Sequence, residues 1–136
     1  MNDVILNKIA NIKRCLTRIN EEFSDEAEFK TNFTKQDSVI LNLQRACEAA
    51  IDIANVLIKQ HQLGIPQSSR HCFELIETGN FIDATVAQNL QKMVGLRNIA
   101  VHDYQALNID IVIAVVKHHL GDFELYIKQI LNSQSN

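Results

Sequence analysis

The stretch that decides the fold is residues 34–57, TKQDSVILNLQRACEAAIDIANVL. Its apolar residues recur every three or four positions, which places them in one stripe along an α-helix. The stripe consists of Ile40, Leu43, Cys47, Ala50, Ala54 and Leu57. Thr34 stands where an N-cap is expected, with Asp37 three residues later in the capping-box position. Gly64 and Pro66 end the pattern. These residues predict one long helix that buries a single face.

The same spacing occurs near both ends of the chain. It predicts an N-terminal helix with the stripe Ile5, Ile9, Ile12, Leu16, Ile19 and Phe23. It also predicts a C-terminal helix with the stripe Ile109, Val112, Val116, Leu120, Phe123, Ile127 and Ile130. Asn108 is the expected N-cap of this last helix. Gly121 lies inside it and costs about 1 kcal/mol relative to alanine, so it permits a bend.

The middle of the chain adds two further helices. Residues 69–77 predict a short helix that stops before Gly79. Asp83 is the expected N-cap of a longer helix, whose inner face carries Val86, Leu90, Met93 and Val94. Residues 24–33 are polar and irregular and predict a loop. The sequence therefore predicts one all-α domain over residues 1–136, an antiparallel bundle of four long helices plus one short helix.

Composition limits the function. The chain has 136 residues, of which 46% are hydrophobic, enough for a real core. Its formal net charge of −3 argues against a protein that coats nucleic acid, because phosphate binding needs concentrated positive charge. A local nucleic-acid site is still compatible with this charge.

Three features predict a cytoplasmic protein. No apolar run approaches the roughly 18–20 residues that cross a bilayer. The chain begins Met1-Asn2-Asp3, without the basic start of a signal peptide. The three cysteines are odd in number and scattered, which is typical of reduced thiols in or near a core.

Arg97 breaks the apolar pattern of the helix that Asp83 begins. At about 100° per residue, several residues fall within about 40° of it on the helical wheel: Val86, Leu90, Met93, Val101 and Tyr104. A charge on an apolar stripe needs a partner or a function. Two structural explanations remain open: the stripe opens to solvent near the end of the bundle, or an acidic residue elsewhere pairs with the guanidinium.

His102 is the second unusual residue. It lies five residues after Arg97, about 140° around a continuous helix, so the two side chains diverge. Asn98 lies four residues before His102 on the same face, where its amide could orient the imidazole or contact a ligand. For Arg97 and His102 to act on one phosphate, either the helix ends between them or a second subunit completes the site.

The segment from Arg97 to Tyr104, RNIAVHDY, resembles the signature of HEPN-domain toxins. That signature is an arginine, a polar residue, three more residues, a histidine, one residue and a tyrosine. The similarity extends to residues 45–48, 69–75 and 90–96. Together with the predicted helices, it makes the whole chain similar to the HepT branch of that family.

The resemblance implies the HEPN fold and the toxin half of a toxin–antitoxin pair. Such toxins are metal-independent endoribonucleases that need no cofactor and form homodimers, in which the motifs of two protomers meet in a shared cleft. Arg97 and His102 would be catalytic and Asn98 would position the substrate. The chemistry of these residues agrees: histidine moves protons near neutral pH, and arginine binds a phosphate through two parallel hydrogen bonds. Attack by the 2′-hydroxyl would leave a 2′,3′-cyclic phosphate.

The resemblance also implies a partner. In the HepT branch an MNT-type nucleotidyltransferase acts as the antitoxin and modifies a tyrosine, here Tyr104, with AMP units. Bulky anionic groups beside Arg97 would then exclude RNA. The alternative for Tyr104 is simple packing, since the helical wheel puts it on the same face as Arg97.

Two other functions stay open at this point. The chain could be a non-catalytic helical partner of a nucleotidyltransferase, in which Arg97 and His102 hold a nucleotide phosphate without cleaving anything. A metal site is disfavoured because adjacent residues of a helix point about 100° apart and no flanking residues supply further ligands. The residues considered for it are His71, Cys72, His118 and His119.

Overall fold

The computed structural model describes residues 2–134, and within them all regular secondary structure is helical. The elements are α1 Asp3–Glu22, α2 Glu26–Phe29, α3 Phe33–His61, α4 Ser69–Thr78, α5 Ala84–His102, the 3₁₀ turn η1 Tyr104–Ala106, α6 Ile109–His118 and α7 Leu120–Gln134. No helix in this part of the chain is both long and apolar enough to cross a membrane.

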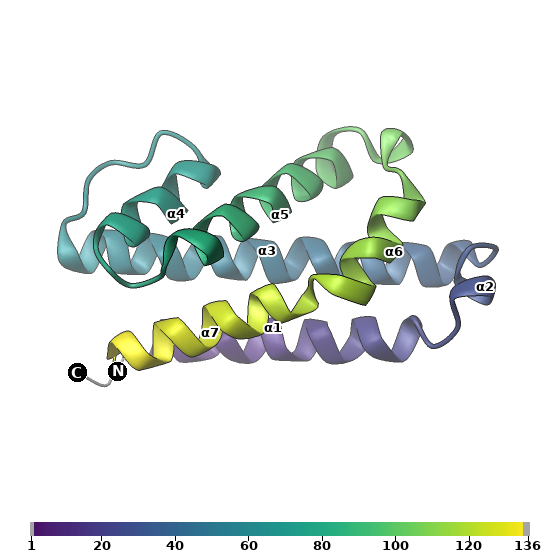
Figure 1. Cartoon of the computed structure of the whole chain (residues 1–136), viewed down its shortest axis with the longest axis horizontal. Coiled ribbons are helices and arrows are strands. Elements are labelled where there is room, and N and C mark those ends of the chain that lie inside the picture. Colours follow the sequence, from purple (N-terminus) through teal and green to yellow (C-terminus); the bar gives the residue numbers. More distant parts are fainter. Residues whose placement is uncertain (1, 135–136) are drawn as a thin grey trace.

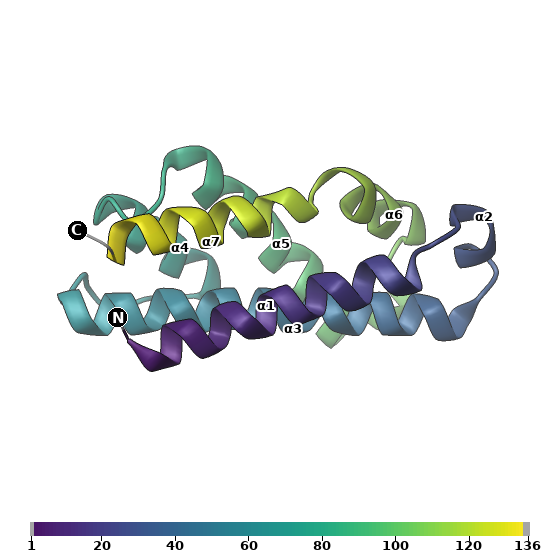
Figure 2. The same cartoon turned by 90° about the horizontal axis from the view of Figure 1, so that it is seen from below.

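Helix α3 runs the length of the molecule, and α1, α2, α4 and α5 pack against it (Figure 1). Helix α1 lies beside it in the antiparallel direction, as the turned view in Figure 2 also shows. Helices α4 and α5 contact each other and α3, and α7 contacts both α5 and α1. The all-α bundle predicted from the sequence is confirmed: α1, α3, α5 and the α6–α7 segment are its long members and α4 is the short one.

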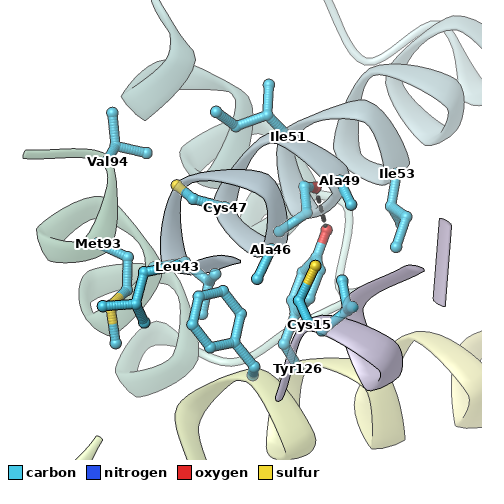
Figure 3. Packing of buried hydrophobic residues seen from close by; sticks show 14 of the residues in the cluster. Cys15, Leu43, Ala46, Cys47, Ala49, Ile51, Ile53, Met93, Val94 and Tyr126 are labelled. Atoms are coloured by element: carbon cyan, nitrogen blue, oxygen red, sulfur yellow. Dashed lines mark hydrogen bonds between the residues drawn. The ribbon is translucent and has the colours of Figure 1, made fainter. Parts of the chain in front are cut away.

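The core consists of the predicted stripes. All six stripe residues of α3 are buried, as are the first five of α1, because each stripe faces neighbouring helices. Tyr126 reaches from α7 into this core, where it is fully buried, and its hydroxyl donates a 2.9 Å hydrogen bond to the Ala50 carbonyl of α3 (Figure 3). The polar atom that burial would otherwise leave without a partner is thereby satisfied.

Two of the predicted caps are confirmed and one is wrong. Asp83 accepts a hydrogen bond from the Val86 N–H at 2.8 Å, and Asn108 accepts one from the Asp110 N–H at 2.8 Å. Helix α3, however, begins at Phe33. Its cap is Asn32, two residues before Thr34, because the Asn32 side chain accepts a hydrogen bond from the Lys35 N–H at 3.0 Å.

Three boundaries also differ from the prediction. The segment 24–33 contains the one-turn helix α2, which forms because Phe29 buries its ring completely. Helix α3 stops at His61, with Gln62 in the left-handed conformation, before Gly64 is reached. The bend permitted by Gly121 lies instead at His119, which separates α6 from α7.

Candidate functional site

Arg97 lies on the inner side of α5 but is only half-buried. Its stem lines an apolar crevice between α3, α5 and α6, beside Leu43, Met93 and Leu107. The guanidinium Nη2 donates a 3.1 Å hydrogen bond to the Ser69 hydroxyl at the start of α4. Its Nε is buried without a hydrogen-bond partner. The side chain therefore sits on the apolar stripe, as predicted, with its charged end held by two neutral groups, the Ser69 hydroxyl and the Cys47 thiol.

No carboxylate forms a salt bridge with Arg97 within residues 2–134. Of the two structural explanations for this arginine, pairing with an acidic residue is thus not the one realised in that part of the chain. The neighbouring thiol of Cys47 does not supply an anion either. Burial raises the pKa of Cys47 to about 12, although the positive charge of Arg97 acts in the opposite direction. The guanidinium keeps its positive charge available for an anionic ligand.

His102 is the last residue of α5 and is exposed. Helix α5 is continuous from Ala84 to His102, so the helix does not end between Arg97 and His102. The two side chains consequently diverge by about 140°, as the helical wheel predicts. Neither His102 nor Asn98, half-buried one turn earlier, has a side-chain hydrogen bond within residues 2–134. A single chain does not bring Arg97 and His102 to one point.

Tyr104 lies outside helix α5, so the helical wheel that placed it on the face of Arg97 does not apply to it. Helix α5 has ended at His102, and Asp103 leads the chain into the 3₁₀ turn that Tyr104 begins. The ring turns towards the start of α3, where its hydroxyl donates a hydrogen bond to the carboxylate of Asp37. The side chain remains 44% exposed, so packing alone does not account for its position. Asp37, expected to cap α3, makes this long-range contact instead.

Asp37 also belongs to an open polar groove between α1 and α3. The groove is lined by basic and acidic side chains, among them Arg14, Arg18, Arg45 and the ion pair Lys8–Asp52. The hydroxyl of Tyr104 therefore meets a carboxylate that is itself exposed to solvent.

Gly95, inside α5, is covered by a side chain of the neighbouring helix. Arg70 of α4 covers it, since a Cβ at Gly95 would stand 2.7 Å from the Arg70 Nη2. Ile99, one turn later, is 42% exposed. The small side chain at 95 thus accommodates a neighbour within the chain, and it gives no support of its own to contact with a second subunit.

Within residues 2–134 no group of three or more His, Cys, Asp or Glu side chains could hold a metal ion. The residues considered for such a site have separate partners. The thiol of Cys72 contacts the Asn55 side chain, His71 accepts from the Gln67 N–H, and His119 lies 3.4 Å from Asp122.

Sequence reasoning missed Ser69 and the contact of Asp37 with Tyr104. Ser69 and Arg97 are 28 residues apart, and Asp37 and Tyr104 are 67 apart, so no local pattern links them. The only available signal was that residues 69–75 share the family resemblance.

The chain is similar to known proteins in both sequence and structure. The sequence model of a family described as ribonuclease HepT-like matches residues 5–130. A curated protein of Shewanella oneidensis named mRNA nuclease HepT is 63% identical over 130 residues, which cover 96% of this chain and 98% of that protein. Two solved structures are similar over nearly the whole chain. One is the tri-AMPylated Shewanella oneidensis HEPN toxin in complex with MNT antitoxin, with 62% identity, a TM-score of 0.93 and coverage of 97% and 99%. The other is a toxin–antitoxin complex with AMP-PNP, with 61% identity, a TM-score of 0.94 and coverage of 96% and 99%.

Proposed function

Because the chain belongs to the HepT-like ribonuclease family, we propose that it is an mRNA-cleaving toxin whose action in the cytoplasm is silenced by an MNT-type nucleotidyltransferase. The observation that carries this proposal is that the two motif residues, Arg97 and His102, have no acidic partner within residues 2–134. Arg97 presents a guanidinium with no acidic partner in the described residues, and His102 ends the same helix exposed and without a hydrogen-bond partner there. Both groups are left available for a ligand.

Arg97 contributes charge. Its fork of N–H donors matches a phosphate, and the Ser69 hydroxyl uses only one of them. During attack of the ribose 2′-hydroxyl on phosphorus, negative charge grows on the non-bridging oxygens. A guanidinium already held in position stabilises that charge by about 3 kcal/mol without further reorganisation.

His102 contributes proton transfer. Its imidazole takes the proton of the 2′-hydroxyl or returns one to the departing 5′-oxygen, a role that typically accelerates a reaction about 10²–10⁴-fold. Asn98 lies on the same face of α5 and positions the substrate or the imidazole. No step in this scheme uses a metal ion, so activity is expected to persist in EDTA. The products are a 2′,3′-cyclic phosphate and a 5′-hydroxyl.

The active unit in this proposal is a homodimer. Support comes from the unbroken helix α5, which points Arg97 and His102 about 140° apart in one chain. Two-fold symmetry places both residues of one protomer against their copies in the other, so each cleft can take its arginine and its histidine from different chains.

Regulation acts through Tyr104. Its hydroxyl is the proposed acceptor of AMP from the nucleotidyltransferase, and support comes from its exposure only two residues beyond His102. Each added AMP brings a phosphodiester charge and a bulky nucleoside close to the RNA site. RNA then loses both space and the attraction of Arg97.

The test is RNA cleavage by purified protein in EDTA. Arg97→Ala and His102→Ala are expected to abolish cleavage, while His118→Ala, an exposed histidine at the end of α6, serves as the matched control and retains it. An RNA oligonucleotide with one 2′-deoxy position should resist cleavage at that position. Cleavage there, or full activity of either site variant, contradicts the proposed chemistry.

A further inference from the structure

The contact between Tyr104 and Asp37 joins two parts of the chain that are 67 residues apart. The tyrosine hydroxyl is the donor and the Asp37 carboxylate is the acceptor. Within residues 2–134 no other hydrogen bond involves the Tyr104 hydroxyl, and no lysine or arginine forms an ion pair with Asp37. Within these residues the carboxylate therefore has no ion-pair partner, and it accepts the one proton of the phenol.

A phenol must lose this proton to become a strong nucleophile. Partial burial and the hydrogen bond and charge of Asp37 raise the pKa of Tyr104 to about 12, so the phenolate is scarce near neutral pH. The proton must then leave as the new bond forms, and a base within hydrogen-bonding distance makes that possible.

We propose that Asp37 is the general base for AMP transfer to Tyr104. This inference rests on the proposed function, in which Tyr104 is the acceptor. The Tyr104 oxygen attacks the α-phosphorus of ATP, and its proton passes to the Asp37 carboxylate. The oxygen–phosphorus bond forms as the bond from the α-phosphorus to the bridging oxygen breaks, and pyrophosphate leaves with that electron pair. The toxin thus supplies one catalytic residue for its own modification.

Access favours this role. Asp37 is exposed and lines the groove between α1 and α3, so the proton can pass on to water after transfer. The modified oxygen no longer carries a proton to donate. The new phosphodiester and Asp37 then repel each other, which releases the tyrosine from α3 once it has been modified.

The nearest competing carboxylate by sequence is Asp103, directly before Tyr104. It is exposed and makes no side-chain hydrogen bond to the tyrosine. Asp103→Asn therefore provides a matched control, because it removes one negative charge directly before Tyr104 without touching the phenol.

The experiment measures incorporation of labelled AMP from ATP, catalysed by a purified MNT-type nucleotidyltransferase. Asp37→Asn keeps an oxygen that accepts the hydrogen bond but removes the base, and it is expected to lower kcat about 10²-fold with an unchanged KM for the toxin. The kcat of Asp37→Ala should fall equally. It should recover in part when formate is added, since the exposed site admits a small carboxylate. Asp103→Asn should keep the wild-type rate. Thermal unfolding of each variant reports whether the fold is retained.

Two results separate the possible failures. If Tyr104→Phe still accepts AMP, or the wild-type chain accepts none, the modification of Tyr104 in the proposed function is wrong. If Tyr104→Phe blocks transfer but Asp37→Asn reacts at the wild-type rate, Asp37 only positions the ring and the inference is overturned. It is overturned equally by a loss of kcat in Asp103→Asn or by the absence of formate rescue in a folded Asp37→Ala variant.

Discussion

Ser69→Ala tests whether Arg97 must be held in place to act on a phosphate. The Ser69 hydroxyl accepts the 3.1 Å hydrogen bond from the Arg97 guanidinium, and the buried Nε of that guanidinium has no hydrogen-bond partner. Removing the hydroxyl takes away this hydrogen bond, while the stem stays in its apolar crevice and only the Cys47 thiol still holds the charged end. The guanidinium then has to be ordered again each time RNA binds.

The expected fall in kcat/KM follows from the loss of the one hydrogen bond between Ser69 and Arg97. A hydrogen bond from a charged donor contributes about 1.5–3 kcal/mol when it is protected from water. Arg97 is only half-buried, so the lower end applies. A loss of about 1.4 kcal/mol in transition-state stabilisation corresponds to a tenfold fall in kcat/KM.

The neighbouring serine supplies the control. Ser68 caps α4 by accepting a 3.1 Å hydrogen bond from the His71 N–H, and it does not contact Arg97. Ser68→Ala should cost about 1 kcal/mol of unfolding free energy with cleavage unchanged. Ser69→Ala should also lower the unfolding free energy by about 1–1.5 kcal/mol, because it loses the hydrogen bond to Arg97, but it alone should lower cleavage.

The assay pairs cleavage of a fluorescent RNA with urea unfolding for both variants. Wild-type cleavage by Ser69→Ala would refute the idea that the guanidinium is prearranged. So would a fall in cleavage that Ser68→Ala reproduces, because the loss would then follow helix stability instead of the contact to Arg97.

Three further outcomes follow from the structure. Both tyrosines of the chain have raised pKa values, Tyr104 to about 12 because of burial and Asp37, and Tyr126 because it is fully buried; ultraviolet titration of the native protein should therefore show no tyrosinate near pH 10, and the stability linked to Tyr104 should be present below its unfolded pKa of about 10 and lost as the pH rises towards 12. Asn32→Ala should lower the unfolding free energy by about 1 kcal/mol in urea titrations, whereas Thr34→Ala should be nearly neutral, since Asn32 caps α3. Tyr126→Phe should cost about 1 kcal/mol in the same measurement, because it deletes a fully buried hydrogen bond to the Ala50 carbonyl.

The bundle could be predicted because its signals are local. The stripes of α1 and α3 repeat every three or four residues, and burial of an amphipathic face requires only that some other helix covers it. The caps Asp83 and Asn108 were likewise predictable, because an N-cap bonds N–H groups only two or three residues away.

The sequence-based predictions fail where a residue distant in the sequence determines which contact a side chain makes. Asp37 fits a local capping motif, but the phenol of Tyr104 uses its carboxylate. The end of α5 at His102 has no glycine or proline to mark it, so the sequence pattern predicted a helix that continues to Tyr104. That extension placed Tyr104 on the helical face of Arg97, whereas the residue lies in the 3₁₀ turn after His102 and bonds Asp37 of α3. Arg97 was recognisable from its misfit on an apolar stripe, but its partner Ser69 was not.

The divergence of Arg97 and His102 on the unbroken helix α5 has one consequence that can be measured. If each cleft takes its arginine from one protomer and its histidine from the other, two inactive variants can repair each other. In a dimer of Arg97→Ala with His102→Ala, one cleft receives both intact residues and the other receives neither. The heterodimer therefore has half of the wild-type sites.

Equal amounts of the two variants, unfolded together and refolded, give about half heterodimers, so activity should return to roughly one quarter of wild type. The RNA cleavage assay in EDTA measures this recovery against each variant refolded alone. A mixture that stays at the background of the single variants would place both residues in a site built within one chain. Helix α5 would then have to unwind between Arg97 and His102. Its last turn would lose the intrahelical hydrogen bonds that it now has. Recovery to one quarter would instead mean that a straight helix suffices, because symmetry supplies the approach that a single chain cannot make.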